Sequence, residues 1–132
     1  MNIIICLDDN NGMMFNRRRQ SRDREVIKDI VKLTGNGRLW MTEYSAKLFS
    51  DIEVQISSEP WKTAESKEYC FIEEIDPVKI LEKTERIVVY KWNRVYPADV
   101  KCSIDFTELQ FIEETEFPGY SHEKITRQIY KK

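Results

Sequence analysis

Arginine is concentrated in one short segment, residues 17–24, which reads Arg-Arg-Arg-Gln-Ser-Arg-Asp-Arg. Its five guanidinium groups supply planar, paired donors that suit phosphate and carboxylate groups. The whole chain is slightly acidic, with a formal net charge of −2, so this basic concentration is local. We predict that four of the arginines bind a small anionic ligand: Arg17, Arg18, Arg19 and Arg22. A solvated loop paired with Asp8, Asp9 and nearby glutamates is an equally open interpretation.

A second basic segment, Lys91-Trp92-Asn93-Arg94, follows an apolar run at residues 86–90. Its cations attract anions, and its tryptophan offers a face on which a ring can stack. We predict that these residues bind a phosphorylated or nucleotide-like ligand, or a base of single-stranded RNA. Tyr44 and Ser45 are expected to donate hydrogen bonds near the same place, although both also suit the start of a short helix as its capping residues.

His122 is the one histidine of the chain and is followed by Glu123. An imidazole beside a carboxylate suits a general acid or base, so His122 is a candidate catalytic residue. The sequence assigns it no serine or cysteine nucleophile, and a structural histidine in a turn is the alternative. A single histidine excludes a His-rich zinc site, and we expect no metal.

We expect no catalytic or metal-binding role for the cysteines and the acidic pairs of the chain. Cys6, Cys70 and Cys102 are odd in number and widely spaced, which favours reduced, buried thiols in an intracellular protein. The acidic pairs 73–74 and 113–114 have no spacing that recommends a metal and are expected to be solvated. No window approaches the roughly 18 apolar residues of a membrane helix, so we expect a cytoplasmic protein with no membrane contact.

The spacing of apolar residues predicts alternating strands and helices. Residues 2–7 form a β-branched run typical of a buried strand, and the turn-forming residues 8–12 end it. Helical spacing predicts a helix over 22–33, with Ser21 as its N-cap and Gly35 just past its end. Further strands are predicted at 38–41, 52–56, 69–72, 86–90, 100–104, 109–116 and 124–130. Shorter helices are predicted at 43–49 and 76–81, and a surface loop at 60–67.

This order of elements predicts one α/β domain over residues 1–132. Its central sheet is expected to be mostly parallel, with flanking helices and a C-terminal antiparallel hairpin. Ligands of open α/β sheets bind beyond the carboxyl ends of the strands, near helix N-termini. Both basic segments follow such strand ends, so we expect them to face one crevice.

The same order resembles dihydrofolate reductase over almost the whole chain, in a shortened form. Three stretches carry the resemblance: Arg38–Ser45, Ile87–Tyr96 and Ser121–Glu123. The resemblance implies that fold, and it aligns Asp23 with the carboxylate that holds the pterin in the reductase. Asp23 is therefore a candidate catalytic residue, although a carboxylate at a helix N-terminus also has a structural explanation.

The cofactor motifs of the reductase are missing. The reductase needs glycines after its central strand because its backbone approaches the dinucleotide pyrophosphate closely, and here Tyr90, Lys91 and Trp92 stand there. Its Gly-Arg pair near the cofactor phosphate is replaced by Thr42-Glu43. NADPH is therefore possible but disfavoured, and Trp92 alternatively fills the space that the cofactor would occupy.

The chain also resembles a group of short Firmicutes-type bacterial proteins that are often labelled ribonuclease Z. The similar stretches are Leu39–Met41, Tyr44–Phe49 and Lys91–Pro97. A ribonuclease Z needs a His-rich dizinc motif, and a chain with one histidine does not have it, so that label does not fit.

The sequence is consistent with three functions. The first is a module that binds a small anionic ligand, and the second is a divergent NADPH-dependent reductase of a pterin-like heterocycle. The third is an interaction module whose arginine segment docks RNA or an acidic protein. The apolar residues of the terminal hairpin also permit a homodimer.

Overall fold

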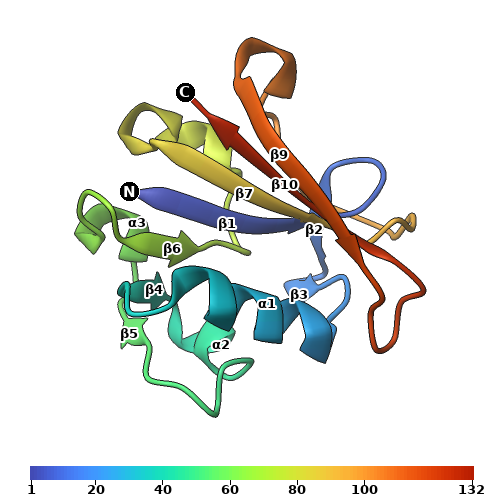
Figure 1. Ribbon diagram of the computed structural model, residues 1–132, viewed down its shortest axis with the longest axis horizontal. Helices are drawn as coiled ribbons and strands as arrows, with labels where there is room; N and C mark the ends of the chain where they lie inside the picture. Colours follow the sequence, from blue (N-terminus) through green and yellow to red (C-terminus); the bar gives the residue numbers. More distant parts are fainter.

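A computed structural model of the chain describes all 132 residues and contains a seven-stranded mixed sheet. In sheet order its strands are β5 (Gln55–Ile56), β4 (Leu39–Met41), β6 (Tyr69–Phe71), β1 (Asn2–Leu7), β7 (Arg86–Lys91), β10 (Ile125–Lys131) and β9 (Gln110–Phe117). Strands β5, β4, β6, β1 and β7 run parallel to one another, and β10 runs antiparallel to both β7 and β9 (Figure 1). The predicted α/β class with a C-terminal antiparallel hairpin is confirmed.

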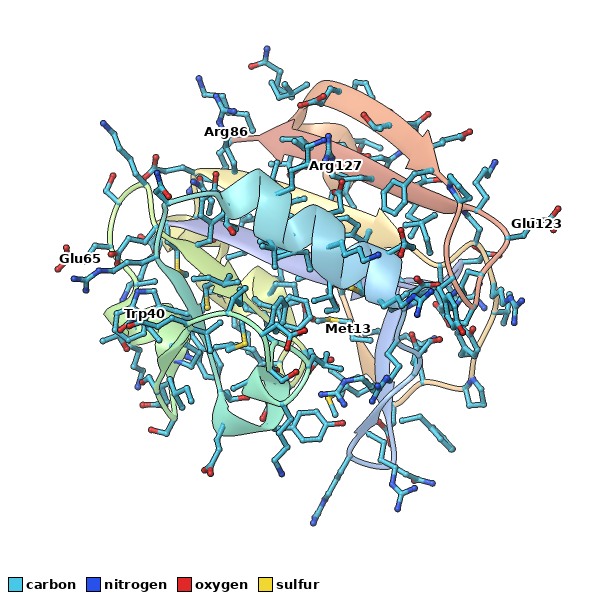
Figure 2. The ribbon with its side chains drawn as sticks, turned by 60° about the horizontal axis from the view of Figure 1, so that its bottom comes forward. Met13, Trp40, Glu65, Arg86, Glu123 and Arg127 are labelled. Carbon is cyan, nitrogen blue, oxygen red and sulfur yellow. The ribbon has the colours of Figure 1, made fainter.

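Strand β1 lies in the middle of the sheet because its side chains are apolar on both faces. Ile3 and Ile5 contribute to one hydrophobic core, and Ile4 contributes to the other. Helix α1 (Arg24–Thr34) covers the Ile4 face through its buried Val26 and Ile30, and Figure 2 shows it lying across that face. The 3-10 helix η1 (Pro77–Lys83) and a second, smaller sheet cover the opposite face.

Helix α1 begins two residues later than the sequence predicts, and its N-cap is Asp23 instead of Ser21. Asp23 has an extended backbone (φ −153°, ψ 126°), and its carboxylate accepts a hydrogen bond from the Glu25 N–H. An aspartate caps as well as a serine does and adds a charge that the helix dipole favours. The end of the helix is as predicted, with Gly35 at a positive φ of 52°.

The arginine segment starts as a β-hairpin, which the sequence analysis did not predict. Strands β2 (Gly12–Phe15) and β3 (Arg18–Arg19) pair across a two-residue turn, and β2 also pairs with β8 (Val100–Lys101). The turn residues Asn16 and Arg17 both have positive φ, which lets a two-residue turn follow the twist of its strands. The predicted strand 100–104 is thus reduced to β8 and belongs to the second sheet.

Several shorter elements differ from the prediction because tertiary contacts set their ends. Helix α2 (Glu43–Ala46) is shorter than predicted, and only β5 remains of the strand predicted at 52–56. The predicted loop 60–67 contains helix α3 (Pro60–Thr63), whose Pro60 is buried. Helix η1 begins after Asp76 as predicted but has 3-10 geometry, and a second 3-10 turn is η2 (Phe106–Glu108). None of the helices is long and apolar enough to cross a membrane.

The central position of β1 predicts a large effect of truncating Ile5, which is fully buried. Ile5→Ala should lower the free energy of unfolding by about 2–5 kcal/mol, because a buried side chain is lost and a cavity remains. Ile56→Ala is the matched control, since Ile56 is 56% exposed, and should change it by less than about 0.5 kcal/mol. Urea unfolding followed by circular dichroism measures both, and equal effects would contradict the assignment of β1 to the core.

Candidate functional site

His122 and Asp23, which are far apart in the sequence, form a buried hydrogen-bonded pair. His122 lies in the loop between β9 and β10, and its Nδ1 is 2.9 Å from Oδ2 of Asp23. The histidine side chain is 2% exposed and the aspartate side chain is fully buried. A carboxylate only accepts, so a neutral imidazole in this position carries its proton on Nδ1 and leaves Nε2 as an acceptor.

Two hydroxyl groups lie within hydrogen-bonding distance of that acceptor. Ser21 Oγ is 2.9 Å and the Tyr96 hydroxyl is 3.1 Å from His122 Nε2. The Tyr96 hydroxyl also donates to Ser21 Oγ at 3.4 Å. The chain therefore contains a continuous Asp23–His122–Ser21 array, and the Tyr96 hydroxyl lies within hydrogen-bonding distance of both His122 and Ser21.

Trp92 packs on this array and fixes the ring plane of His122. The two rings are stacked, with centroids 4.7 Å apart and planes 23° apart. Trp92 is 4% exposed. It is one of the residues that stand where the resemblance to the reductase would place glycines, which let the backbone approach a dinucleotide closely. Its side chain therefore fills interior space and presents no open stacking face to a ligand.

The Asp23 carboxylate is fully occupied by protein donors. It accepts from the backbone N–H groups of Glu25, Tyr120 and Ser121, from the Ser121 hydroxyl, and from His122. Burial alone would raise the pKa of this carboxyl, but these hydrogen bonds outweigh it and hold the pKa well below its usual range. Asp23 thus stays ionised and orients His122, with no acceptor position left for a heterocycle.

Three of the residues predicted to bind a ligand form a closed internal network instead. The Arg19 guanidinium makes two hydrogen bonds to the Glu73 carboxylate, at 2.8 and 3.0 Å, and lies 4.3 Å from the Tyr44 ring centroid. Ser45 Oγ donates to Glu73 at 2.6 Å. Glu73 is buried, so its predicted solvation was wrong, because Arg19 supplies the countercharge. Neither Tyr44 nor Ser45 caps helix α2, whose N-cap is Thr42.

The two basic segments face separate hollows, so the expected single crevice is divided. Arg18 borders a groove of about 480 Å³, which we call the Arg18 groove; it is lined by Phe15, Asn16, Arg18, Arg19, Gln20, Tyr96 and Pro97. Arg94 borders a hollow of about 390 Å³ together with Glu123 and Lys124. Arg17 borders a third, which contains Glu74 and Asp99. Only the Arg18 groove, of these three, has no carboxylate in its lining.

Of the other residues predicted to bind a ligand, some make structural contacts and one is exposed without a partner. Lys91 ends β7 and pairs with Leu7 of β1. Asn93 has a positive φ of 60°, and its side-chain amide donates to the Lys124 carbonyl and the Thr126 hydroxyl, which holds the turn. Arg22 is exposed and has no acidic partner.

Sequence reasoning missed Ser21 and Tyr96 as partners of His122. The nearest signal was the pair Ser21 and Asp23 on either side of Arg22, directly before the first long helix. Residues at positions i and i+2 of an extended segment point to the same side, so this spacing is consistent with both residues contacting one ring but does not say which ring it is. The connection depends on a histidine 99 residues away from Asp23.

The buried carboxylate predicts a specific pH dependence of stability. At pH 7, Asp23→Asn should lower the free energy of unfolding by about 1–3 kcal/mol, because an amide leaves several buried N–H donors without a charged acceptor. The pKa of Asp23 is lower in the folded state than its value of about 4 in the unfolded chain, so the ionised carboxylate stabilises the fold above pH 4. This stabilisation is lost progressively as the pH falls below 4. The difference between wild type and variant should therefore narrow below pH 4.

Urea unfolding at several pH values between 3 and 7 measures this difference. Asp51→Asn is the matched control, because Asp51 is exposed, and it should show neither the loss at pH 7 nor the narrowing. A constant difference between wild type and Asp23→Asn at every pH would contradict the assignment of an ionised Asp23.

Comparison with known proteins identifies the fold. By sequence, neither a protein-family profile nor a curated protein matches this chain. By structure, the chain is similar to dihydrofolate reductase from Enterococcus faecalis complexed with NADP(H) and RAB-propyl, with a TM-score of 0.68 and 11% identity, over 98% of this chain and 94% of that chain. A likeness at that identity is a likeness of fold. The similarity to proteins labelled ribonuclease Z stays a prediction, and the dihydrofolate reductase-like α/β fold is confirmed.

Proposed function

We propose that this protein binds a small anionic ligand in the Arg18 groove. The observation that carries the proposal is the lining of that groove, which includes the unpaired Arg18 guanidinium and no carboxylate in a chain of net charge −2. The other two hollows near the basic segments include Glu123, or Glu74 and Asp99, which would repel an anion.

Arg18 is the residue available to contact the ligand. It is exposed and forms no ion pair, whereas its neighbour Arg19 is already neutralised by Glu73. A free guanidinium binds phosphate or carboxylate through two parallel N–H donors. Arg17 and Arg22, which are also exposed and form no ion pair, add positive charge to the same segment of the chain.

The rest of the lining favours a ligand with an apolar or aromatic part beside its charge. Phe15 is 42% exposed and shares the groove with Pro97. An exposed aromatic ring is a surface on which a heterocyclic base can stack. The volume of about 480 Å³ lies in the range of small-molecule sites. We therefore favour a phosphorylated or nucleotide-like compound over RNA or an acidic protein.

Binding of inorganic pyrophosphate and of adenosine monophosphate, followed by isothermal titration calorimetry at low salt, tests the site. Arg18→Gln should weaken binding about tenfold or more, because a charge-assisted bond of about 1.5–3 kcal/mol is removed. Arg86→Gln is the matched control: Arg86 is also exposed, at the amino end of β7, and Figure 2 shows it at the opposite end of the molecule from Glu123. If both variants weaken anion binding equally, the effect comes from net charge alone, and the assignment of the site to the Arg18 groove is contradicted.

A titration with NADPH separates this proposal from a divergent reductase. Trp92 is buried against His122, so its ring offers no open face on which part of a dinucleotide could stack. We expect no saturable change in tryptophan fluorescence at micromolar NADPH. Saturable quenching, accompanied by NADPH oxidation with a pterin, would favour the reductase and overturn the reading of Trp92.

A further inference from the structure

We propose that Ser21 is a nucleophile, activated by His122 and Asp23, for the cleavage of an ester on a small anionic substrate. The inference rests on the proposed binding of an anion in the Arg18 groove and adds a reaction to it. It depends on the geometry of three side chains, each hydrogen-bonded to the next.

The distances in the array are those of a general base and its partners. Ser21 Oγ and His122 Nε2 are 2.9 Å apart, which is within the reach needed for direct proton transfer. His122 Nδ1 and Asp23 Oδ2 are also 2.9 Å apart, which fixes the tautomer in which Nε2 accepts. The base and its orienting carboxylate are shielded from water, while Ser21 is partly exposed and therefore within reach of a substrate.

Donors for a developing negative charge are available next to Ser21. The backbone N–H groups of Ser21 and Arg22 lie outside the helices and strands and donate to no protein acceptor. Such free amides beside a nucleophile stabilise the oxyanion of an acyl-transfer intermediate. The Tyr96 hydroxyl donates to the nucleophile itself, 3.4 Å from Ser21 Oγ.

The array and the Arg18 groove are connected through Tyr96 and Gln20. Tyr96 lines the groove while its hydroxyl bonds to both His122 and Ser21, and Gln20 lines the groove and precedes Ser21 in the chain. A carboxylate or phosphate held by Arg18 therefore leaves the remainder of the ligand close to the serine. This arrangement points to an ester that carries an anionic group.

The proposed reaction has two steps that balance. Ser21 Oγ attacks the acyl carbon, its proton passes to His122 Nε2, and the bond to the leaving alcohol breaks as His122 returns that proton to it. Water then attacks the acyl carbon and gives a proton to His122. The bond from that carbon to Ser21 Oγ breaks as His122 returns the proton to Oγ, which regenerates the serine hydroxyl and releases a carboxylic acid. Asp23 stays ionised throughout and stabilises the imidazolium that forms in each step.

Labelling with a serine-directed fluorophosphonate, followed by peptide mapping, tests the nucleophile. We expect the label on Ser21, and we expect Ser21→Ala and His122→Gln to reduce labelling at least about tenfold. Ser66→Ala is the matched control, since Ser66 is an exposed serine distant in sequence from the array, and should label like wild type. Label on Tyr96, or labelling of Ser21 that is independent of His122, would overturn the proposal.

A second variant keeps the test valid if His122→Gln fails to fold. Ser21→Cys places a thiol beside His122 Nε2, and it should react with iodoacetamide at least about tenfold faster than the thiol of Ser66→Cys. Equal rates in the two folded variants would overturn the activation of this position. Pyrophosphate binding measured on the same samples separates the two proposals. If the protein binds pyrophosphate but Ser21 is not labelled, only the nucleophile proposal fails. If Ser21 is labelled but no anion binds, only the proposal of an anion site in the Arg18 groove fails.

Discussion

The Asp23 carboxylate is the interaction on which this end of the molecule depends. A buried charge is tolerated only when it is paired and fully hydrogen-bonded, and Asp23 meets this condition through groups from two separate segments, the start of helix α1 and the loop before β10. It caps helix α1, accepts from two amides of the loop before β10, and binds the His122 ring. One side chain thus fixes the start of the helix, the terminal loop and the orientation of the imidazole relative to each other.

Several side chains that the sequence offered for ligand binding are instead held in contacts with other parts of this chain. Trp92 stacks on His122 at one end of the sheet, and the Arg19–Glu73 pair, with Tyr44 and Ser45, forms a compact polar network at another place. The polar groups in these contacts have partners within the chain, so they are not free to bind a ligand. The hollows near the basic segments lie around the hairpin of β2 and β3 and the turn after β7.

The fold explains how residues from distant parts of the sequence meet. Parallel strands β1 and β7 end at the same edge of the sheet, so the segments that follow them, which contain Ser21 and Tyr96, are brought together. The antiparallel hairpin of β9 and β10 returns the loop that contains His122 to the same edge. A scaffold of this kind hosts many chemistries, so the likeness to dihydrofolate reductase gives the framework and the local side chains must give the activity.

The sequence by itself determined the α/β class, the central strand of residues 2–7, the helix ending at Gly35 and the C-terminal hairpin, because these depend on local periodicity and turn residues. It also identified Asp23 and His122, though as unconnected candidates. Only the tertiary structure decided that the two bond to each other, that Ser21 faces the ring instead of capping a helix, and that Arg19 is paired while Arg18 is open. The reason is physical: hydrogen bonds and ion pairs between residues about 100 positions apart depend on strand order and register, which local patterns do not encode.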